Sequence, residues 1–374
     1  MAPIRTTLLI SSLALAAAAS AQTSTVQLEG SVGAGLTHKN HQTGSGTLNE
    51  VSPNLLVASY LRFGGSEDLG GGMKAIFRLE ASLNMDTGNP GGPGAGTTPT
   101  SLKFFNRQSW VGVDMGRAGT LTLGRQFHAA TDRAIRTFDI YNVGGTSLHN
   151  TPLGLFGVNR FNGNDTRVDN SVKYRFGMPG VIDLALSYGF GEVVGNGSLG
   201  RSYSAEVSQT TALYSIGASV VSFNAPALVA TTGFLPKHDL VTVGGNVKLG
   251  DFRPYAAYYK SKLDSTVAGR LTQKNSILDL GLAWAGYSQL QFKGNYVDDK
   301  GTSLNGLAGR DGHKKTLVLS AEYFLSKRTS LNAAVFNNRF SDGYKLEANN
   351  LAGLSRDPTA SSVSGYSAGI VHTF

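Results

Sequence analysis

Two glycine-bounded motifs in this chain have the spacing of catalytic or nucleotide-binding sequences. Gly365-Tyr-Ser-Ala-Gly369 matches the G-x-S-x-G pattern, in which a serine on a strand–turn–helix attacks an acyl carbon. That motif needs a helix with acid and histidine partners beyond it, and the five residues after Gly369 continue an alternating strand pattern. Gly195–Gly200 matches G-x-G-x-x-G but opens a strand-like segment, not the helix that binds a dinucleotide. We therefore expect no enzymatic activity.

The metal-binding and nucleic-acid-binding residue types also lack the spacing that those functions need. The seven histidines are scattered, and His38 with His41 in a polar segment makes only a weak two-ligand site. The chain has no cysteine, which excludes disulfide scaffolds and thiolate metal sites. The formal net charge of +8 arises without a basic run, which argues against a nucleic-acid partner. We expect no cofactor.

Basic side chains at alternate positions can instead act on ions through their charge. Arg62 lies between Leu61 and Phe63, so it points to the face opposite these apolar residues. By the same alternation, residues 167, 171, 173 and 175 lie opposite an apolar face, which groups Arg167, Lys173 and Arg175. A charged side chain facing lipid at mid-membrane costs about 2–4 kcal/mol. In a membrane-spanning strand, Arg62 and Lys173 would therefore face a water-filled interior.

In the segments that would position these side chains, apolar and polar residues alternate, and this alternation continues along the whole chain. Ile182 to Phe190, Leu278 to Trp284, and Tyr366 to Phe374 alternate apolar with small or polar residues. Charged residues make up 16% of the chain, against roughly 25% in ordinary soluble domains. Glycine is abundant, with 48 residues, and runs of 18 or more apolar residues are absent. This pattern predicts an all-β protein.

The connections between the strands alternate in length. Short links are predicted at 65–72, 115–119, 177–180, 209–211, 250–251, 286–288 and 326–328. Long polar links are predicted at 39–54, 85–103, 127–167, 192–200, 224–237, 262–274, 300–312 and 341–362. Fifteen connections give sixteen strands, an even number with short turns on one side and long loops on the other. We therefore predict a 16-stranded antiparallel transmembrane β-barrel. The alternative is a secreted soluble β protein.

Residues 1–21 have a different composition from the rest of the chain. Arg5 precedes a short apolar core from Leu8 to Ala18, and Ala19-Ser-Ala21 fits the small-x-small cleavage rule. We read 1–21 as a secretory signal peptide and 22–374 as the barrel domain of an exported protein.

Several segments resemble the Gram-negative trimeric general porins, in particular the beta-proteobacterial type. The resemblance covers the whole of 22–374. It rests on four stretches: 25–30 (Thr-Val-Gln-Leu-Glu-Gly), the turn 61–75 with Gly70-Gly-Gly72, the pair 107–113 and 119–126, and His372-Thr-Phe374. The resemblance implies a homotrimer in the outer membrane through which small hydrophilic solutes and ions diffuse passively. It also implies that Phe374 is the signal read by the barrel assembly machinery, and that the exterior contacts lipid and lipopolysaccharide.

The resemblance also implies a pore constriction. The long loop 127–167 would be the third loop of the family, folded into the lumen, with Asp132 and Asp139 facing a wall of Arg62, Arg125 and Arg167. Arg125 shares its phase with Leu121 and Leu123, so it needs a bulge or the strand's end to turn inward. Arg133, Arg136 and Arg160 would add positive potential, and rings of charge set ion preference. We expect a preference for anions. A solute-specific channel of the same fold and a barrel acting as an adhesin or enzyme are the alternatives.

Overall fold

The computed structural model describes residues 24–42, 46–53, 56, 58–89, 103–132, 137, 140–141, 167–224, 236–265, 269–346, 356–357 and 359–374. The predicted signal peptide, 1–21, lies outside these residues. No helix within them is long and apolar enough to cross a membrane.

Nearly all of the described chain is β-structure. The strands are β1 (Ser24–Gln42), β2 (Gly46–Pro53), β3 (Tyr60–Gly70), β4 (Met73–Ser82), β5 (Gln108–Asp114), β6 (Thr120–Phe127), β7 (Arg167–Met178), β8 (Ile182–Gly189), β9 (Ser202–Thr210), β10 (Tyr214–Asn224), β11 (Pro236–Val247), β12 (Phe252–Ser265), β13 (Gln273–Tyr287), β14 (Leu290–Thr302), β15 (Gly312–Phe324), β16 (Thr329–Phe340) and β17 (Ser362–Thr373). Short helical turns are η1 (Gly116–Ala118), α2 (Ala129–Asp132), η3 (Leu304–Gly306) and η4 (Asp342–Leu346).

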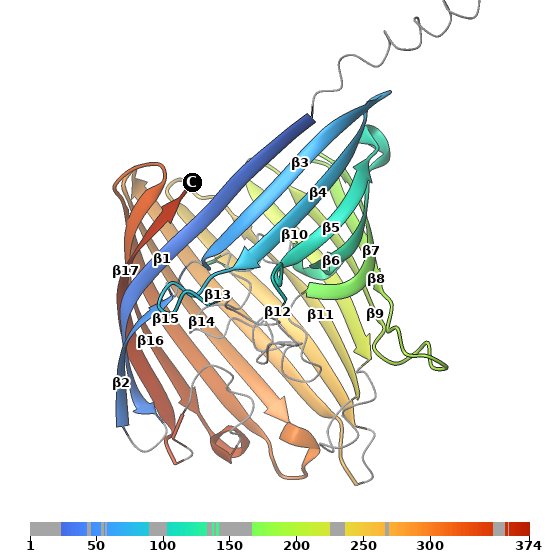
Figure 1. Ribbon diagram of the computed structural model, residues 1–374. Helices are drawn as coiled ribbons and strands as arrows, with labels where there is room; N and C mark the ends of the chain where they lie inside the picture. Colours follow the sequence, from blue (N-terminus) through green and yellow to red (C-terminus); the bar gives the residue numbers. More distant parts are fainter. Residues whose placement is uncertain are drawn as a thin grey trace, which may run out of the picture.

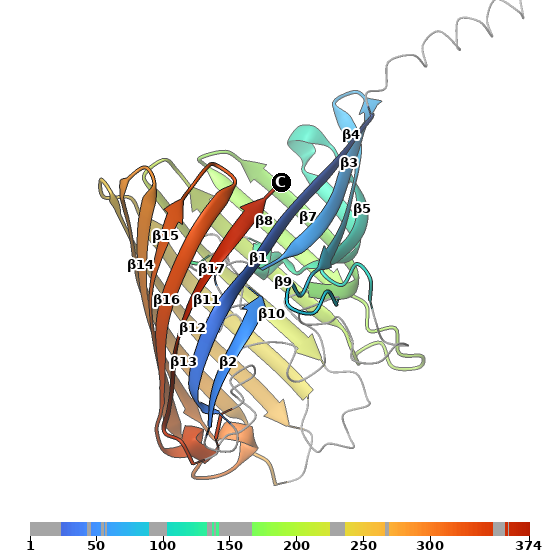
Figure 2. The same ribbon diagram turned by 60° about the vertical axis from the view of Figure 1, so that its left-hand side comes forward.

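The strands close into one antiparallel barrel. From β3 onward each strand pairs with the next, and β1 pairs with β17 over Ser31–Lys39, which completes the ring (Figures 1 and 2). Closure leaves every strand with a hydrogen-bonding partner, which a sheet in lipid requires.

The barrel has sixteen strand positions, as predicted, although seventeen strands are present. β2 and β3 occupy one position, because β2 pairs with the 34–42 half of β1 and β3 pairs with its 24–31 half. Between them, Leu56 is buried in a cluster that includes the wall residues Val318, Ala334 and Phe336. The Ser59 hydroxyl then accepts a hydrogen bond from the backbone N–H of Gly33 (2.9 Å) as the chain rejoins the wall.

Each of the seven predicted short links contains or adjoins a turn at one end of the barrel, the end near the C marker in Figure 1, although most of 65–72 belongs to β3. The predicted long link at 39–54 is wrong, because β1 continues to Gln42 and β2 begins at Gly46. Several of its polar residues are side chains of the inner face that pair across this hairpin. Thr37 bonds Ser52 (2.7 Å) and Lys39 pairs with Glu50 (2.7 Å).

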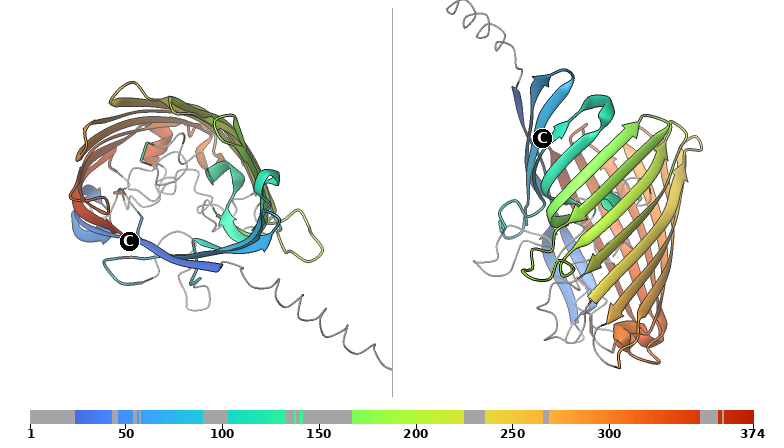
Figure 3. Two further views of the ribbon diagram at one scale, coloured as in Figure 1. Left: turned by 90° about the horizontal axis from the view of Figure 1, so that it is seen from above. Right: turned by 90° about the vertical axis from the view of Figure 1, so that its right-hand side faces the viewer.

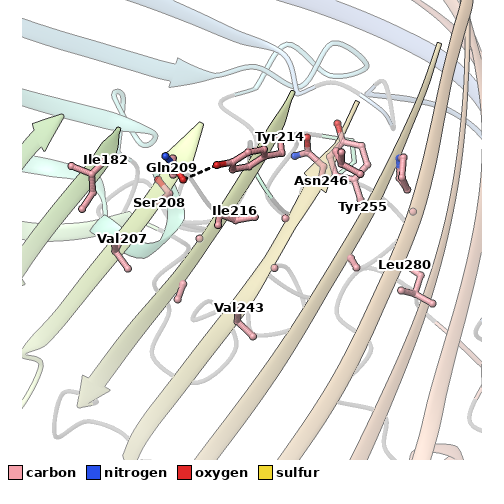
Figure 4. Close-up of a pocket in the computed structure, with 18 of the residues that line it drawn as sticks. Ile182, Val207, Ser208, Gln209, Tyr214, Ile216, Val243, Asn246, Tyr255 and Leu280 are labelled. Carbon is pink, nitrogen blue, oxygen red and sulfur yellow. Dashed lines mark hydrogen bonds between the residues drawn. The ribbon is translucent and has the colours of Figure 1, made fainter. Parts of the chain in front are cut away.

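The outer face of the wall is an apolar belt. Exposed Leu, Val, Ile and Tyr side chains alternate with buried polar ones along most strands, as in β9, where Tyr203 and Val207 alternate with Ser202, Ser204 and Ser208. A groove of about 1130 Å³ lies in this belt across β8 to β13 (Figure 4). Its apolar lining includes Val207, Ile216, Val243 and Leu280, and the Tyr214 hydroxyl at one edge donates to Gln209 (3.0 Å). The groove belongs to the outer surface and not to the lumen.

Candidate functional site

The first part of loop 127–167 lies inside the barrel against the wall. Seen along the barrel axis, α2 lies within the ring of strands (Figure 3). The Ala129 N–H donates to the Ser187 hydroxyl on β8 (3.1 Å), and Ala130 packs in a buried cluster with Phe223 and Tyr259. By strand alternation, Ser187, Phe223 and Tyr259 lie on the lumen-facing side of their strands. The loop is therefore held by apolar packing on the inner wall.

Two more contacts continue this docking toward β13. The Asn246 side-chain amide on β11 donates to the Thr137 carbonyl (2.9 Å). Ile140 lies over Gly281, where a side chain would meet Ile140 atoms at 3.1–3.5 Å. Tyr141 is buried beside Ile140, with the Lys293 ammonium 5.9 Å from its ring centre. The missing side chain at Gly281 is what lets the loop lie close to the wall.

Across the lumen, Arg62 lies in a network of charges. Its Nε donates to Glu80 (2.8 Å) and its Nη1 to Glu29 (3.0 Å). Arg107 binds the other oxygen of Glu80, whose side chain is 1% exposed, and Gln108 donates to Glu80 as well (3.0 Å). Arg62 was expected to face loop acids, and here it is paired with two carboxylates of its own wall.

The Tyr60 ring supports the two arginines of this network. The guanidinium carbons of Arg62 and Arg107 lie 4.7 and 5.4 Å from the ring centre. Arginine over an aromatic face gains a cation–π attraction, and both side chains lose rotamer freedom. The guanidinium groups of Arg62 and Arg107 are therefore held in fixed positions.

Arg125 belongs to a second cluster. It is 7% exposed, and it donates to Asp169 (2.8 Å) and to the Asn106 carbonyl (2.6 Å). Lys103 pairs with the same Asp169. The β6–β7 register shifts at this point, because Gly124 pairs with Ser171 but Gln126 pairs with Val168. Two residues of β7, Asp169 and Asn170, thus oppose Arg125, and Asn170 has a left-handed φ of 52°.

The same bulge changes the phase that was expected for Arg167. Val168, not Arg167, packs in the inner-wall cluster with Ala130. Arg167 is buried and its guanidinium lies 4.3 Å from the centre of the Phe127 ring. The alternation that placed Arg167 in line with Lys173 therefore does not hold beyond the bulge.

Lys173 and Arg175 lie on the regular part of β7, after the bulge. Lys173 is 8% exposed and its ammonium donates to the Phe127 carbonyl (3.1 Å), at the start of the loop. Arg175 is half-buried, opposite Thr120 on β6 and Ala185 on β8.

Most of the loop residues that were predicted to form the constriction lie outside the described residues. Asp132 is the last residue of α2, and its side chain is not described. Arg133, Arg136, Asp139 and Arg160 lie outside the described residues.

Sequence reasoning missed the acidic partners on the wall. Glu80 alternates with the outward residues Phe77 and Leu79 in the same way that Arg62 alternates with Leu61 and Phe63, so the same pattern places it inside. Asp169 has the same parity as 167, 171, 173 and 175, so simple alternation would also have grouped it with them, although the bulge at Asp169 and Asn170 breaks that alternation in the structure.

Comparison with known proteins identifies the architecture. The sequence profile described as Gram-negative porin matches residues 6–343. The chain belongs to the Gram-negative porin family. It is 24% identical to outer membrane porin protein 32 of Delftia acidovorans over 368 residues, 97% of each chain. An outer membrane porin protein of Bordetella pertussis is 29% identical over 126 residues, which are 34% of this chain and 29% of that protein.

Solved structures agree on the fold. An anion-selective porin from Comamonas acidovorans superposes with a TM-score of 0.77 at 21% identity, covering 94% of this chain and 100% of that one. OmpT of Vibrio cholerae in its trimer form gives 0.65 at 15% identity, with 94% and 100% covered. The protein is an outer-membrane porin, a non-enzymatic channel.

Proposed function

We propose that this porin is a general diffusion channel that prefers anions. The main support for the proposal is that bases outnumber acids on the part of the barrel wall opposite the loop. We call this part of the wall, without its short turns at 66–74 and 114–119, the basic wall. In its described part, from β3 to β7 together with Glu29 of β1, eight bases lie with four acids: Arg62, Arg78, Lys103, Arg107, Arg125, Arg167, Lys173 and Arg175 with Glu29, Glu80, Asp86 and Asp169. Fixed charge in a narrow wet pore sets ion preference.

Two further points support this reading. The inward docking of loop 127–167 narrows the lumen from the opposite side. One structural relative is itself described as anion-selective. The loop bases Arg133 and Arg136 add positive charge, and Asp132 and Asp139 subtract from it, so we include all four in the proposed constriction.

The test is the reversal potential of single channels in a planar bilayer under a KCl gradient. The wild-type protein should give a potential of the sign for chloride preference. Replacing Arg62 and Lys173 by Glu should move the potential toward potassium, and Arg62→Gln alone should move it less in the same direction. Unchanged potentials in both variants would remove the basic wall from the selectivity mechanism.

We further propose that the channel assembles as a homotrimer through the β1–β2–β17 wall. A polar group lies on the outer face there. His38 bonds Asn49 (2.7 Å) and stacks on Tyr366 with ring centres 4.9 Å apart, beside exposed Leu36 and Val51. A bonded polar pair at membrane height fits a protein interface better than lipid. Conductance steps in groups of three would support this assembly.

Processing and assembly complete the proposal. Residues 1–21 direct export and are removed, and Phe374 is recognised by the barrel assembly machinery. Removing Phe374 should lower the amount of folded barrel in the outer membrane without changing the amount exported.

A further inference from the structure

The loop that joins β8 to β9, residues 190–201, projects outward from the barrel. It lies outside the ring of strands, at the end of β8 and β9 that carries the long loops (Figures 1 and 3). It contains the G-x-G-x-x-G sequence of Gly195–Gly200, to which diffusion through the pore gives no role. Asn196, Gly197 and Ser198 within it are all exposed. The Asn196-Gly197 dipeptide is therefore open to water.

The side-chain amide oxygen of Asn196 accepts two hydrogen bonds from Ser198. The Ser198 backbone N–H lies 3.2 Å from Oδ1, and the Ser198 hydroxyl lies 2.7 Å from it. A backbone N–H can only donate, so the atom that faces it is the amide oxygen and not the amide nitrogen. Two donors at a carbonyl oxygen stabilise the negative charge that develops there when its carbon is attacked. The Asn196 amide carbon, Cγ, is therefore activated toward a nucleophile.

A nucleophile is adjacent in the chain. Attack of the Gly197 backbone nitrogen on Asn196 Cγ closes a five-membered ring, and an intramolecular attack of this kind needs no second molecule to bind. Among the described residues, the Gly197 N–H donates no hydrogen bond. A Cβ at Gly197 would have nothing within 4 Å. Neither a hydrogen bond nor a neighbouring side chain therefore holds this nitrogen back.

We propose that Asn196 is a site of spontaneous deamidation in the folded porin. The Gly197 nitrogen bonds to Asn196 Cγ and gives its proton to water, while the Cγ–Nδ2 bond breaks and Nδ2 leaves as ammonia with a proton from water. The product is a cyclic imide. Water then adds to one of its two carbonyl carbons, and the ring opens to aspartate or isoaspartate. Water is the only co-reactant, and one neutral amide becomes one carboxylate.

Another Asn-Gly dipeptide, Asn305-Gly306 in η3, has the opposite environment. The Gly306 N–H donates to the Ser303 carbonyl (2.8 Å), so the corresponding nucleophile is engaged. The Asn305 N–H donates to the Gln273 side chain (2.9 Å), and the Asn305 carbonyl accepts from Arg270 (2.9 Å). These hydrogen bonds oppose the backbone rotation that ring closure needs. We therefore expect Asn305 to be protected in the folded barrel.

The modification changes the outer surface and not the lumen. The Asn224 side chain donates to the Ser198 carbonyl (3.0 Å) and its backbone N–H to the Arg201 carbonyl (2.9 Å), which ties the loop to the end of β10. Isoaspartate at 196 lengthens the main chain by one carbon beside this tie, and either product adds one negative charge. The proposal is independent of the ion preference of the pore, so each can fail without the other.

The experiment follows both asparagines in the folded full-length barrel, in detergent and mildly alkaline buffer. Trypsin then releases peptides 176–201 and 301–310, each with a single asparagine, and mass spectrometry with chromatographic separation of the isoaspartyl forms measures conversion. Asn196 should convert about tenfold or more faster than Asn305, because ring closure at Asn305 first breaks hydrogen bonds. In denatured protein the two rates should be similar, since both dipeptides are then in a flexible chain.

Ser198→Ala tests the activation of the Asn196 amide. The variant keeps the backbone N–H but loses the hydroxyl, so conversion in the folded barrel, relative to the same variant denatured, should slow about two- to tenfold, the effect of one hydrogen bond. Ser326→Ala, which removes an exposed hydroxyl from a short turn, should convert like wild type. Equal rates at Asn196 and Asn305 in the folded barrel, or the same rate ratio in denatured protein, would overturn the site. An unchanged rate in Ser198→Ala would overturn the activation by Ser198.

Discussion

Glu80 sets the net charge of the basic wall at the residue scale. One buried carboxylate accepts hydrogen bonds from Arg62, Arg107 and Gln108, so it holds two cations in place and cancels part of their charge. Arg62 therefore does not act as an isolated positive charge in the lumen. In the proposed function, the ion preference of the pore depends on the balance between Glu80 and its partners.

Glu80→Gln should increase the preference for chloride. The amide keeps the volume of Glu80 but leaves Arg62 and Arg107 with one negative charge fewer, so the reversal potential under a KCl gradient should move further toward chloride. Breaking a buried ion pair also destabilises, by about 3–5 kcal/mol, so the melting temperature should fall.

The matched control is Glu29→Gln, because the Glu29 side chain is 47% exposed and, among the described residues, pairs only with Arg62. It should shift the potential in the same direction but by less. A reversal potential for Glu80→Gln equal to wild type would show that the network lies outside the path of the ions.

The sequence predicted single inward charges better than their partners. Alternation with Leu61 and Phe63 was enough to place Arg62, because its strand is regular there. It was not enough for Arg167, because the extra residue in β7 changes the phase between Ser171 and Val168. A bulge is set by local hydrogen bonding and by the left-handed Asn170, and neither leaves a periodic signal in the sequence.

At the scale of elements, the loop inside the barrel and the strands behind it form one packed unit. The inner faces of β10 to β16 are not uniformly polar, as a fully wet wall would be. They carry buried apolar residues such as Phe223, Tyr259 and Phe336 where the loop segments dock. Sequence alternation assigned apolar residues to the lipid side, so these inner apolar residues could not be recognised before the loop was placed.

Gly281→Leu should change the conductance by moving the loop. A leucine side chain at Gly281 would occupy the space now filled by the Ile140 side chain. Ile140 cannot move outward, because β13 lies on that side. The loop must therefore shift into the lumen or detach, and the single-channel conductance should differ from wild type with more current noise.

The control for this prediction is Gly294→Leu on the adjacent strand. Gly294 lies opposite Leu282 on the outer face, and its added side chain meets only the flexible end of Leu319. Its conductance should match wild type. If Gly281→Leu also conducts like wild type, then Ile140 does not fix the position of the constriction.

At the scale of the whole molecule, the alternation and the turn spacing were enough to predict a closed sixteen-stranded barrel. Several of the short turns contain Gly or Asp, as in Asp68–Gly72, and this helped to locate them, whereas 209–211 and 326–328 were located from the spacing of the alternating segments. The hairpin of β1 and β2 was missed because its lumen-facing Thr37, Lys39 and Glu50 are as polar as a loop. Polarity identifies the wet side of the wall but does not separate a strand that faces water from a loop.

A small contact between Gly30 of β1 and Phe374, just after β17, extends the ladder that closes the ring. The Gly30 N–H donates to the Phe374 carbonyl (3.0 Å), and the Phe374 N–H donates to the Gly30 carbonyl (3.1 Å). The Phe374 ring covers Gly30 so closely that a Cβ there would lie 2.3 Å from its Cζ atom. A larger residue at position 30 would therefore displace the Phe374 ring from its place over β1, although the two backbone hydrogen bonds do not themselves require glycine.

Gly30→Val should weaken closure of the whole barrel. The new side chain displaces the Phe374 ring, and overpacking of this kind costs about 1–3 kcal/mol. We expect a lower melting temperature and a smaller folded fraction in the heat-dependent mobility shift on detergent gels, with unchanged ion preference in the channels that do form. Gly46→Val is the matched control, because nothing lies within 4 Å of a Cβ there. Equal stability of the two variants would mean that the barrel closes through the β1–β17 ladder alone, without the Gly30–Phe374 contact.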